Sequence, residues 1–226
     1  LLWYRKSHVW FAICSLKKNS KTLNMKMTNL TFRTAVFSLF AGSILSLAVS
    51  CKKDKEIVTI QPLQSAPISS ALFLNGFFTI TTPGAGSYEY GTVFQVTKNG
   101  KITRLACKMP TAGSYRVTLW DTAANPKTPL AQATITQPGN GVLTYGTITP
   151  VNVTTTGTYL VSIWSNTNWF EIRPIVAGPL PYPITSGDIV LKSYQWVGTP
   201  QSPIKYPTNV DNSYIAGMAD VEFQAN

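Results

Sequence analysis

From about Ser69 to the C-terminus, the chain consists of short segments rich in Thr, Val, Ile and Tyr, separated by Gly, Pro and Asn. The separators recur about every 8–12 residues, which is typical of a β-sandwich or barrel. No segment keeps the period of about 3.6 residues that marks an amphipathic helix. The pattern therefore predicts an all-β fold, a single antiparallel β-sandwich over residues 69–226. We expect about nine or ten strands, near 71–80, 88–97, 101–109, 113–120, 130–137, 142–153, 157–165, 168–174, 188–197 and 213–224.

Alternation of apolar and polar residues assigns the faces of the clearer strands. Two acidic residues near the C-terminus, Asp220 and Glu222, alternate with apolar ones and are expected on a solvated face. The dipeptide Asn99-Gly100 predicts a hairpin turn, because both residues tolerate a positive φ. The residues expected to point into the core include Tyr115, Val117, Leu119, Val221 and Phe223.

An uncharged segment of fifteen residues, 35–49, follows Arg33 near the N-terminus. A membrane-spanning helix needs about 20 residues, so the segment is typical of the apolar region of a signal peptide. The residues before Cys51 end in Ala48-Val49-Ser50 and resemble the bacterial lipobox. We therefore expect a lipoprotein signal peptide at 25–50, with acyl chains on Cys51 after cleavage. An uncleaved anchor is the alternative, and residues 1–24, which lack methionine, are interpreted as an upstream segment outside the translated protein.

A charged cluster, Lys52-Lys53-Asp54-Lys55-Glu56, follows Cys51 and resembles the start of mature lipoproteins of the Bacteroidetes. That resemblance implies a lipid-anchored protein of the outer membrane, facing the cell surface or the periplasm. Residues 51–68 are then expected to form the lipidated cysteine and a flexible polar tether. Once Cys51 is acylated, no disulfide framework remains, and Cys107 is expected to be a small buried hydrophobe.

The charge distribution argues against a nucleic-acid partner. Of the formal charge of +10, residues 1–56 carry +8 and residues 57–226 carry only +2. Nine cations spread over the domain do not form the basic stripe that phosphate backbones require. We therefore expect the membrane, through the acyl chains of Cys51, to be one partner and exclude nucleic acid.

Catalytic chemistry is also disfavoured. The only histidine, His8, lies in the upstream segment, so the domain has no histidine for a catalytic triad or for a metal. A glycosidase built on two carboxylates is the less favoured enzymatic alternative. We expect no cofactor and no catalytic residue, while a structural calcium ion is left open on the loop carboxylates Asp121, Asp188 and Asp211.

The aromatic residues are the more informative set. Trp164 and Trp169 flank a segment with two amide side chains, Asn166 and Asn168, which is interpreted as a hairpin loop. Indole rings stack on sugar faces and donate an N–H at their edge, so this loop is a candidate glycan site. A second platform is expected where Tyr194 and Trp196 share a strand face with Lys192. Ordinary core packing is the alternative for all of these rings.

Several motifs occur in the same order as in a known family. The chain contains Gly91-Thr-Val-Phe, Gly100-Lys-Ile, a strand that ends in Leu119-Trp120, and Gly157-Thr-Tyr-Leu-Val-Ser. Over residues 71–224 this resembles the bacterial domain of unknown function family 4082. The pattern departs at Gly141, which is followed by Val142 where the family commonly has Gly-Trp. The resemblance implies a β-sandwich on secreted, sometimes carbohydrate-related proteins, and no established catalytic residues.

Together these features predict a non-catalytic surface lipoprotein whose β-sandwich binds an extracellular ligand, with a glycan favoured. The alternative is a structural or adhesive protein that binds other proteins through a sheet edge or a loop. The candidate ligand-binding residues are Trp164, Asn166, Asn168, Trp169, Tyr194 and Trp196.

Overall fold

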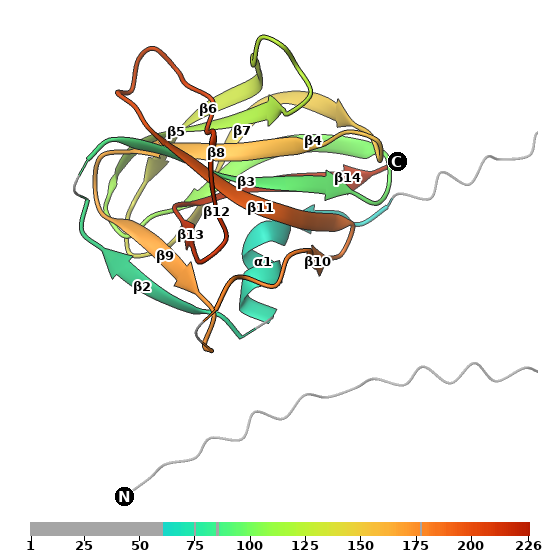
Figure 1. Cartoon of the computed structure of the whole chain (residues 1–226). Helices are drawn as coiled ribbons and strands as arrows, with labels where there is room; N and C mark the ends of the chain where they lie inside the picture. The colour runs from blue at the N-terminus through green and yellow to red at the C-terminus, as the bar shows by residue number, and fades with distance from the viewer. Residues whose placement is uncertain (1–60, 75, 85, 177) are drawn as a thin grey trace, which may run out of the picture. The chain divides into compact units, whose positions relative to one another are not determined.

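The computed structural model describes residues 61–226, except residues 75, 85 and 177 (Figure 1). The signal peptide predicted at 25–50, the lipidation of Cys51, the upstream segment 1–24 and most of the tether lie outside the described residues. Within the described residues, no helix is long and apolar enough to cross a membrane.

The described residues form three antiparallel sheets and one helix, α1 (Pro67–Leu74). The first sheet has the order β1-β14-β4-β7 and is built from β1 (Leu63–Ser65), β4 (Gly100–Lys108), β7 (Leu143–Val153) and β14 (Met218–Ala225). The second has the order β10-β11-β3-β8-β5-β6, with β12 also paired to β11; its strands are β3 (Tyr88–Val96), β5 (Gly113–Asp121), β6 (Pro129–Gln137), β8 (Tyr159–Ser165), β10 (Ile184–Ser186), β11 (Ile189–Gly198) and β12 (Asn209–Asp211). The third has the order β13-β9-β2, with β2 (Phe78–Thr82), β9 (Trp169–Arg173) and β13 (Ile215–Ala216).

The predicted all-β sandwich is confirmed. The two larger sheets pack face to face, and the small sheet of β2 and β9 closes one end (Figure 1). Phe94 and Leu119 from one sheet meet Leu105 and Phe223 from the other, and all four are fully buried. Each such side chain stabilises the fold by roughly 1.5–3 kcal/mol through removal from water. Cys107 is fully buried in the same core, as expected, and burial raises the pKa of its thiol to about 12.

The expected strand at 71–80 is wrong. Residues 67–74 form α1 instead, and the strand there, β2, begins only at Phe78. Pro67 occupies the first helical position, where its missing N–H costs nothing. The expected tether also ends earlier than residue 68, because Leu63–Ser65 pairs with β14 and Ile68 is buried. A helix this short depends on tertiary contacts rather than on intrinsic propensity, which is why periodicity did not indicate it.

The expected hairpin at Asn99-Gly100 is also wrong. β3 and β4, on either side of it, belong to different sheets, so the turn carries the chain from one layer of the sandwich to the other. A Cβ at Gly100 would collide with the carbonyl of Gln224 and the ring of Phe223. Gly100 therefore permits a close approach between strands and does not close a two-residue hairpin.

The last strand of the sequence pattern, 213–224, is interrupted at Gly217, whose φ is +64°. The break sends β13 to the small sheet and β14 to the four-stranded sheet. Both faces of β14 are buried, so the expected solvated face of Asp220 and Glu222 is wrong. Glu222 forms an ion pair with Arg104, which holds the pKa of its carboxyl below the usual range.

Asp220 caps α1 from a distant strand. Its carboxylate accepts the backbone N–H groups of Ile68 at 3.1 Å and of Ser69 at 2.7 Å. These N–H groups lie in the first helical turn, where no intrahelical acceptor exists. Asp220 is fully buried, and burial raises the pKa of its carboxyl to about 6.

We expect this buried carboxyl to make the domain more stable in mild acid. Between about pH 4 and pH 6, Asp220 is protonated in the folded state and ionised in the unfolded state. The stabilisation that this residue contributes to the folded state therefore falls as the pH rises through that range. The size is about 3 kcal/mol for a shift of roughly two pH units. Urea unfolding of the wild type and of Asp220→Asn at pH 4, 5, 6 and 7 measures it as the difference between the two curves. Parallel curves would contradict the prediction.

Candidate ligand-binding site

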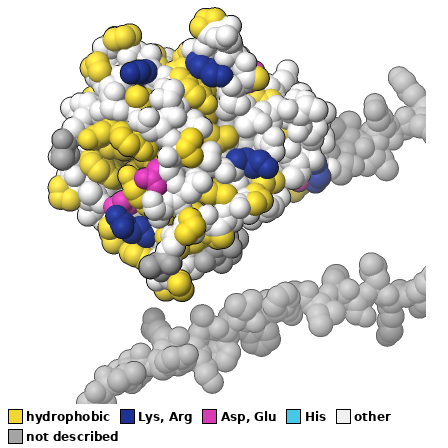
Figure 2. Space-filling view, viewed as in Figure 1, with side chains coloured by type: hydrophobic (Ala, Val, Ile, Leu, Met, Phe, Trp, Pro, Cys, Tyr) yellow, Lys and Arg dark blue, Asp and Glu magenta, His cyan; other side chains and the backbone are white. Residues whose placement is uncertain are grey.

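A pocket lies on the inner face of the seven-stranded sheet, where the small sheet closes the sandwich. Its cavity is about 180 Å³ and its walls are mostly aromatic. Figure 2 views the molecule from this side and shows hydrophobic side chains around a hollow, with acidic side chains beside it. The residues that line the pocket are Thr82, Tyr88, Tyr90, Trp169, Glu171, Tyr194, Trp196, Tyr214 and Ala216.

The pocket has a buried floor and half-buried walls. The floor consists of Tyr194, Ala216 and Tyr90, whose exposed fractions are 1%, 2% and 4%. The walls are the rings of Trp169, Trp196, Tyr88 and Tyr214, each partly exposed. A ligand that enters therefore meets aromatic faces on its sides and loses most of its water at the floor.

The rings hold one another in place. Tyr88 lies at the centre: its ring stacks on Tyr90 with centroids 5.6 Å apart and meets Trp169 and Trp196 edge-on at 6.1 and 5.9 Å. Trp169 also contacts Tyr90 at 5.5 Å. Such pairs contribute about 0.5–1.5 kcal/mol beyond burial, so the walls are ordered before a ligand arrives.

One carboxylate faces the aromatic walls. Glu171, on β9, is nearly buried and accepts a hydrogen bond from the hydroxyl of Thr82 at 3.1 Å. Its other oxygen pairs with Arg173 at 2.9 Å. Arg173 itself is about half exposed and lies over the ring of Tyr214, 5.6 Å from its centroid. The pocket thus contains a fixed anionic acceptor at its small-sheet side.

The hydroxyl of Tyr90 has no hydrogen-bond partner within the part of the chain that the structure describes. A buried hydroxyl without a partner costs about 1–3 kcal/mol, so most native hydroxyls find one. Six buried side-chain atoms of the described residues lack a partner, and the Tyr90 hydroxyl is the one that belongs to the lining of this pocket. A ligand that reached this hydroxyl would remove that cost.

Two carboxylates shape the charge of the pocket. Burial raises the pKa of the Tyr214 hydroxyl, and the negative charges of Asp211 and Glu171 raise it further, while Arg173 opposes them. Asp211 lies on β12 directly opposite Tyr194 of β11. The Tyr214 hydroxyl therefore stays protonated and available as a donor at neutral pH.

The structure divides the six candidate residues into two groups. Trp169, Tyr194 and Trp196 line the same pocket, so the two platforms expected from the sequence are one site. Lys192 does not belong to it, contrary to expectation. The register of β11 against β3 skips Lys192, and this bulge reverses the pleat between Leu191 and Tyr194.

Trp164 lies elsewhere, and the expected pairing with Trp169 is wrong. The segment between them is not a hairpin loop, because β8 and β9 belong to different sheets. Trp164 points to the outer face of the seven-stranded sheet, is 8% exposed, and donates its indole N–H to the carbonyl of Thr199 at 3.1 Å. It is a structural residue under the segment that follows β11.

The two amides of the loop are exposed, and neither lines the pocket. Asn168 accepts the backbone N–H of Gly84 at 3.1 Å and so ties the loop to the segment after β2. Asn166 lies at the loop's surface. The structure thus gives Asn168 a local structural contact instead of a place beside the rings.

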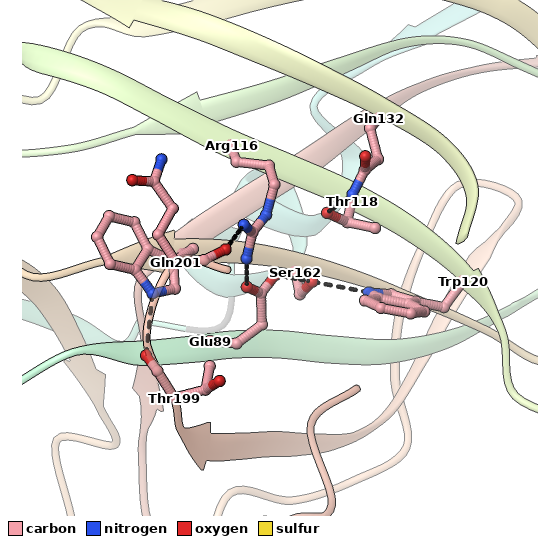
Figure 3. Close-up of polar contacts among 9 residues, drawn as sticks. Glu89, Arg116, Thr118, Trp120, Gln132, Ser162, Thr199 and Gln201 are labelled. Carbon is pink, nitrogen blue, oxygen red and sulfur yellow. Dashed lines mark hydrogen bonds and ion pairs between the residues drawn. The ribbon is translucent and has the colours of Figure 1, made fainter. Parts of the chain in front are cut away.

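The outer face of the seven-stranded sheet carries a second buried cluster (Figure 3). Glu89 is fully buried and accepts hydrogen bonds from Ser162 at 2.5 Å and from Arg116 at 2.6 Å. Trp120 donates its indole N–H to Ser162 at 2.9 Å. Arg116 also binds the carbonyl of Gln201, so the cluster fastens the segment 199–206 over the sheet. None of these cluster residues lines the aromatic pocket.

No group of three or more metal-ligating side chains occurs within the described residues. The loop carboxylates considered for calcium are engaged separately: Asp121 accepts the N–H of Ala123, Asp188 pairs with Lys98, and Asp211 binds Ser213. These contacts account for each carboxylate without an ion.

Sequence reasoning missed four of the residues that define the pocket: Tyr88, Tyr90, Glu171 and Tyr214. A signal existed in Tyr88-Glu-Tyr90, because residues two apart in a strand share a face. Their proximity to Trp169 depends on the packing of β9 against β3, which strand patterns do not encode.

Comparisons with known proteins give no match: no family model matches the chain, and no curated protein matches it. The resemblance to family 4082 stays a prediction from the residues that carry it. The geometry of the pocket is therefore the feature of this protein that indicates a function.

Proposed function

We propose that the protein is a non-catalytic lipoprotein, anchored in the outer membrane through acyl chains on Cys51, whose β-sandwich binds a glycan in the aromatic pocket. The observation that carries the proposal is the pocket itself. Trp169, Trp196 and Tyr88 present aromatic surface, while Glu171 and the unpartnered hydroxyl of Tyr90 present polar atoms.

This combination suits a sugar ring. A pyranose has apolar C–H faces that pack on aromatic rings and hydroxyl groups at its edge that require hydrogen-bond partners. The carboxylate of Glu171 accepts hydroxyl hydrogens, and the hydroxyl of Tyr90 either donates or accepts. The aromatic walls therefore suit the apolar faces of a sugar ring, and the polar groups suit the hydroxyl groups at its edge.

The size of the cavity limits the ligand. At about 180 Å³ it is smaller than the roughly 300–1,000 Å³ clefts that enclose drug-sized ligands. With a buried floor below partly exposed walls, the pocket accepts one ring and leaves the rest of a chain in solvent. We infer that it binds a chain end or a side branch of the glycan.

Removing a wall ring should weaken glycan binding. We expect Trp196→Ala to lower affinity by about 30-fold, the effect of losing one central anchor worth about 2 kcal/mol. Affinity electrophoresis against a panel of plant, microbial and host polysaccharides measures the loss. Phe73→Ala is the matched control, because Phe73 is an exposed aromatic on α1 outside the pocket. Equal retardation of Trp196→Ala and wild type would refute the assignment.

Localisation has a separate test. We expect Cys51→Ala to abolish labelling by radioactive fatty acid and to release the protein from membranes, because acyl chains supply the anchor. Fractionation of cells that express the variant measures the release. Retention of the variant in the membrane fraction would favour an uncleaved anchor.

Binding of a protein partner is the second candidate function, and one observation favours it. β2 is an edge strand of the small sheet, and its Phe78 and Ile80 side chains are 41% and 38% exposed. An exposed apolar edge pairs readily with a strand from another chain. If no polysaccharide retards the wild type, this edge becomes the leading candidate.

A further inference from the structure

The charged groups at the aromatic pocket are predominantly negative. Glu171 lines the cavity, and Asp211 lies on the neighbouring strand opposite Tyr194. Among the residues that the structure describes, the cation in contact with this group is Arg173, which pairs with Glu171 from a partly exposed position. Lys192, the nearest cation along β11, is exposed at the bulge and does not line the pocket.

The aromatic walls, like the carboxylates, favour the binding of a cation. Each ring presents a negative quadrupole at its face, and a cation within about 6 Å of a ring centroid is attracted to it. Arg173 already shows this attraction at the pocket's margin, 5.6 Å from the centroid of Tyr214. Inside the cavity, Trp169, Trp196 and Tyr88 offer further faces that no cation of the described residues occupies.

We propose that the pocket selects a ring-sized unit that carries a positively charged nitrogen, which on a glycan is an amino sugar with a free, unacetylated amine. This inference rests on the proposed glycan function and names the class of sugar. An ammonium group donates to the remaining lone pairs of Glu171 and to the oxygen of Tyr90, and its charge lies against the aromatic faces.

The same chemistry excludes other sugars. An N-acetylated amine is neutral and loses the charge interaction, while its added acetyl group occupies part of a cavity of about 180 Å³. A uronic acid or a sulfated sugar places a negative charge next to Glu171 and is repelled. The pocket should therefore rank oligosaccharides by the charge of the terminal ring: cationic, then neutral, then anionic.

Isothermal titration calorimetry of the purified protein with three probes tests this order. The probes are the tetrasaccharide of glucosamine, the tetrasaccharide of N-acetylglucosamine, and tetramethylammonium chloride, at a pH below the amine pKa. We expect the glucosamine probe to bind about 5- to 30-fold more tightly than its acetylated counterpart, which is the range expected for a cation–aromatic contact. Only the binding of the cationic probes should weaken as salt is added.

Variants assign the preference to the pocket. Glu171→Gln keeps the shape of the side chain and should lower affinity for the glucosamine probe about 10- to 100-fold, the range of a hydrogen bond to a charged group, with little change for a neutral sugar. Asp121→Asn is the matched control, because it removes the same charge from a carboxylate at the end of β5, outside the pocket. Melting temperatures show whether both variants are folded. If Glu171→Gln does not fold, the salt dependence of wild-type binding still tests the charge preference.

The outcomes separate this inference from the proposed function. Equal affinity for both tetrasaccharides overturns the charge preference and leaves glycan binding in place. Binding of tetramethylammonium with no binding of either tetrasaccharide supports a cation site and overturns the glycan function. Absence of binding by all three probes overturns the cation site, and the polysaccharide panel then decides the glycan function alone.

Discussion

Arg116→Ala should destabilise the domain by about 3–5 kcal/mol, because it leaves the carboxylate of Glu89 buried without its charge partner. Glu89 is fully buried and its ion pair with Arg116 is 2.6 Å long. After the change, the hydroxyl of Ser162 is its one remaining side-chain donor among the described residues. Urea unfolding at pH 7, followed by tryptophan fluorescence, measures the loss in the free energy of unfolding.

The destabilisation should depend on pH in a defined direction. Burial raises the pKa of Glu89 in the folded protein, and Ser162 and Arg116 partly offset that effect. Without Arg116 the pKa rises further, so protonation in acid removes the buried charge and restores part of the stability. Lys127→Ala, which removes an exposed cation over Tyr206, is the control and should cost little. A loss below about 1 kcal/mol for Arg116→Ala would contradict the central role of this ion pair.

Trp164→Ala should also destabilise the domain by about 3–5 kcal/mol, the usual cost of deleting a buried aromatic side chain. The ring is 8% exposed, and its N–H holds the carbonyl of Thr199. The variant should nevertheless bind the pocket's ligand with wild-type affinity under conditions in which it is folded. Trp164 lies on the outer face of the seven-stranded sheet, whereas the pocket lies on the inner face. Thermal unfolding and calorimetry on one preparation measure both quantities.

Trp169→Ala provides the matched comparison. Its ring is partly exposed in the pocket wall, so the change should weaken binding more than folding. The two tryptophans are five positions apart in the sequence, yet their expected phenotypes are opposite. If Trp164→Ala abolishes binding while the protein stays folded, the assignment of the pocket is incorrect.

The strand pattern of the sequence was sufficient to predict the architecture. Alternation placed Tyr115, Val117 and Leu119 in the core, and all three are buried there. The signal is strong in β5 because these apolar residues share one face, which leaves a single register that buries it. The same reasoning failed for α1, whose first turn is capped by Asp220 from the far end of the chain.

The site was predicted only in part, for a related reason. Trp169, Tyr194 and Trp196 were identified from residue type, because aromatic rings with a polar edge suit the faces of sugar rings. Their convergence with Tyr88 and Tyr90 depends on which sheet each strand joins and on the bulge at Lys192. Both are tertiary features, so local sequence indicated the rings without indicating the pocket.

The indole N–H signals of the four described tryptophans test the central claim most directly. Two of these residues, Trp169 and Trp196, line the pocket. The other two, Trp120 and Trp164, are buried on the outer face of the seven-stranded sheet. Nuclear magnetic resonance spectra of the ¹⁵N-labelled protein, titrated with oligosaccharides from the polysaccharide that retards it most, follow all four at once. The proposed function predicts that the Trp169 and Trp196 signals shift with a common saturation curve while the other two stay in place. Saturable shifts confined to Trp120 and Trp164, or no shift at any tryptophan at saturating sugar, would contradict it.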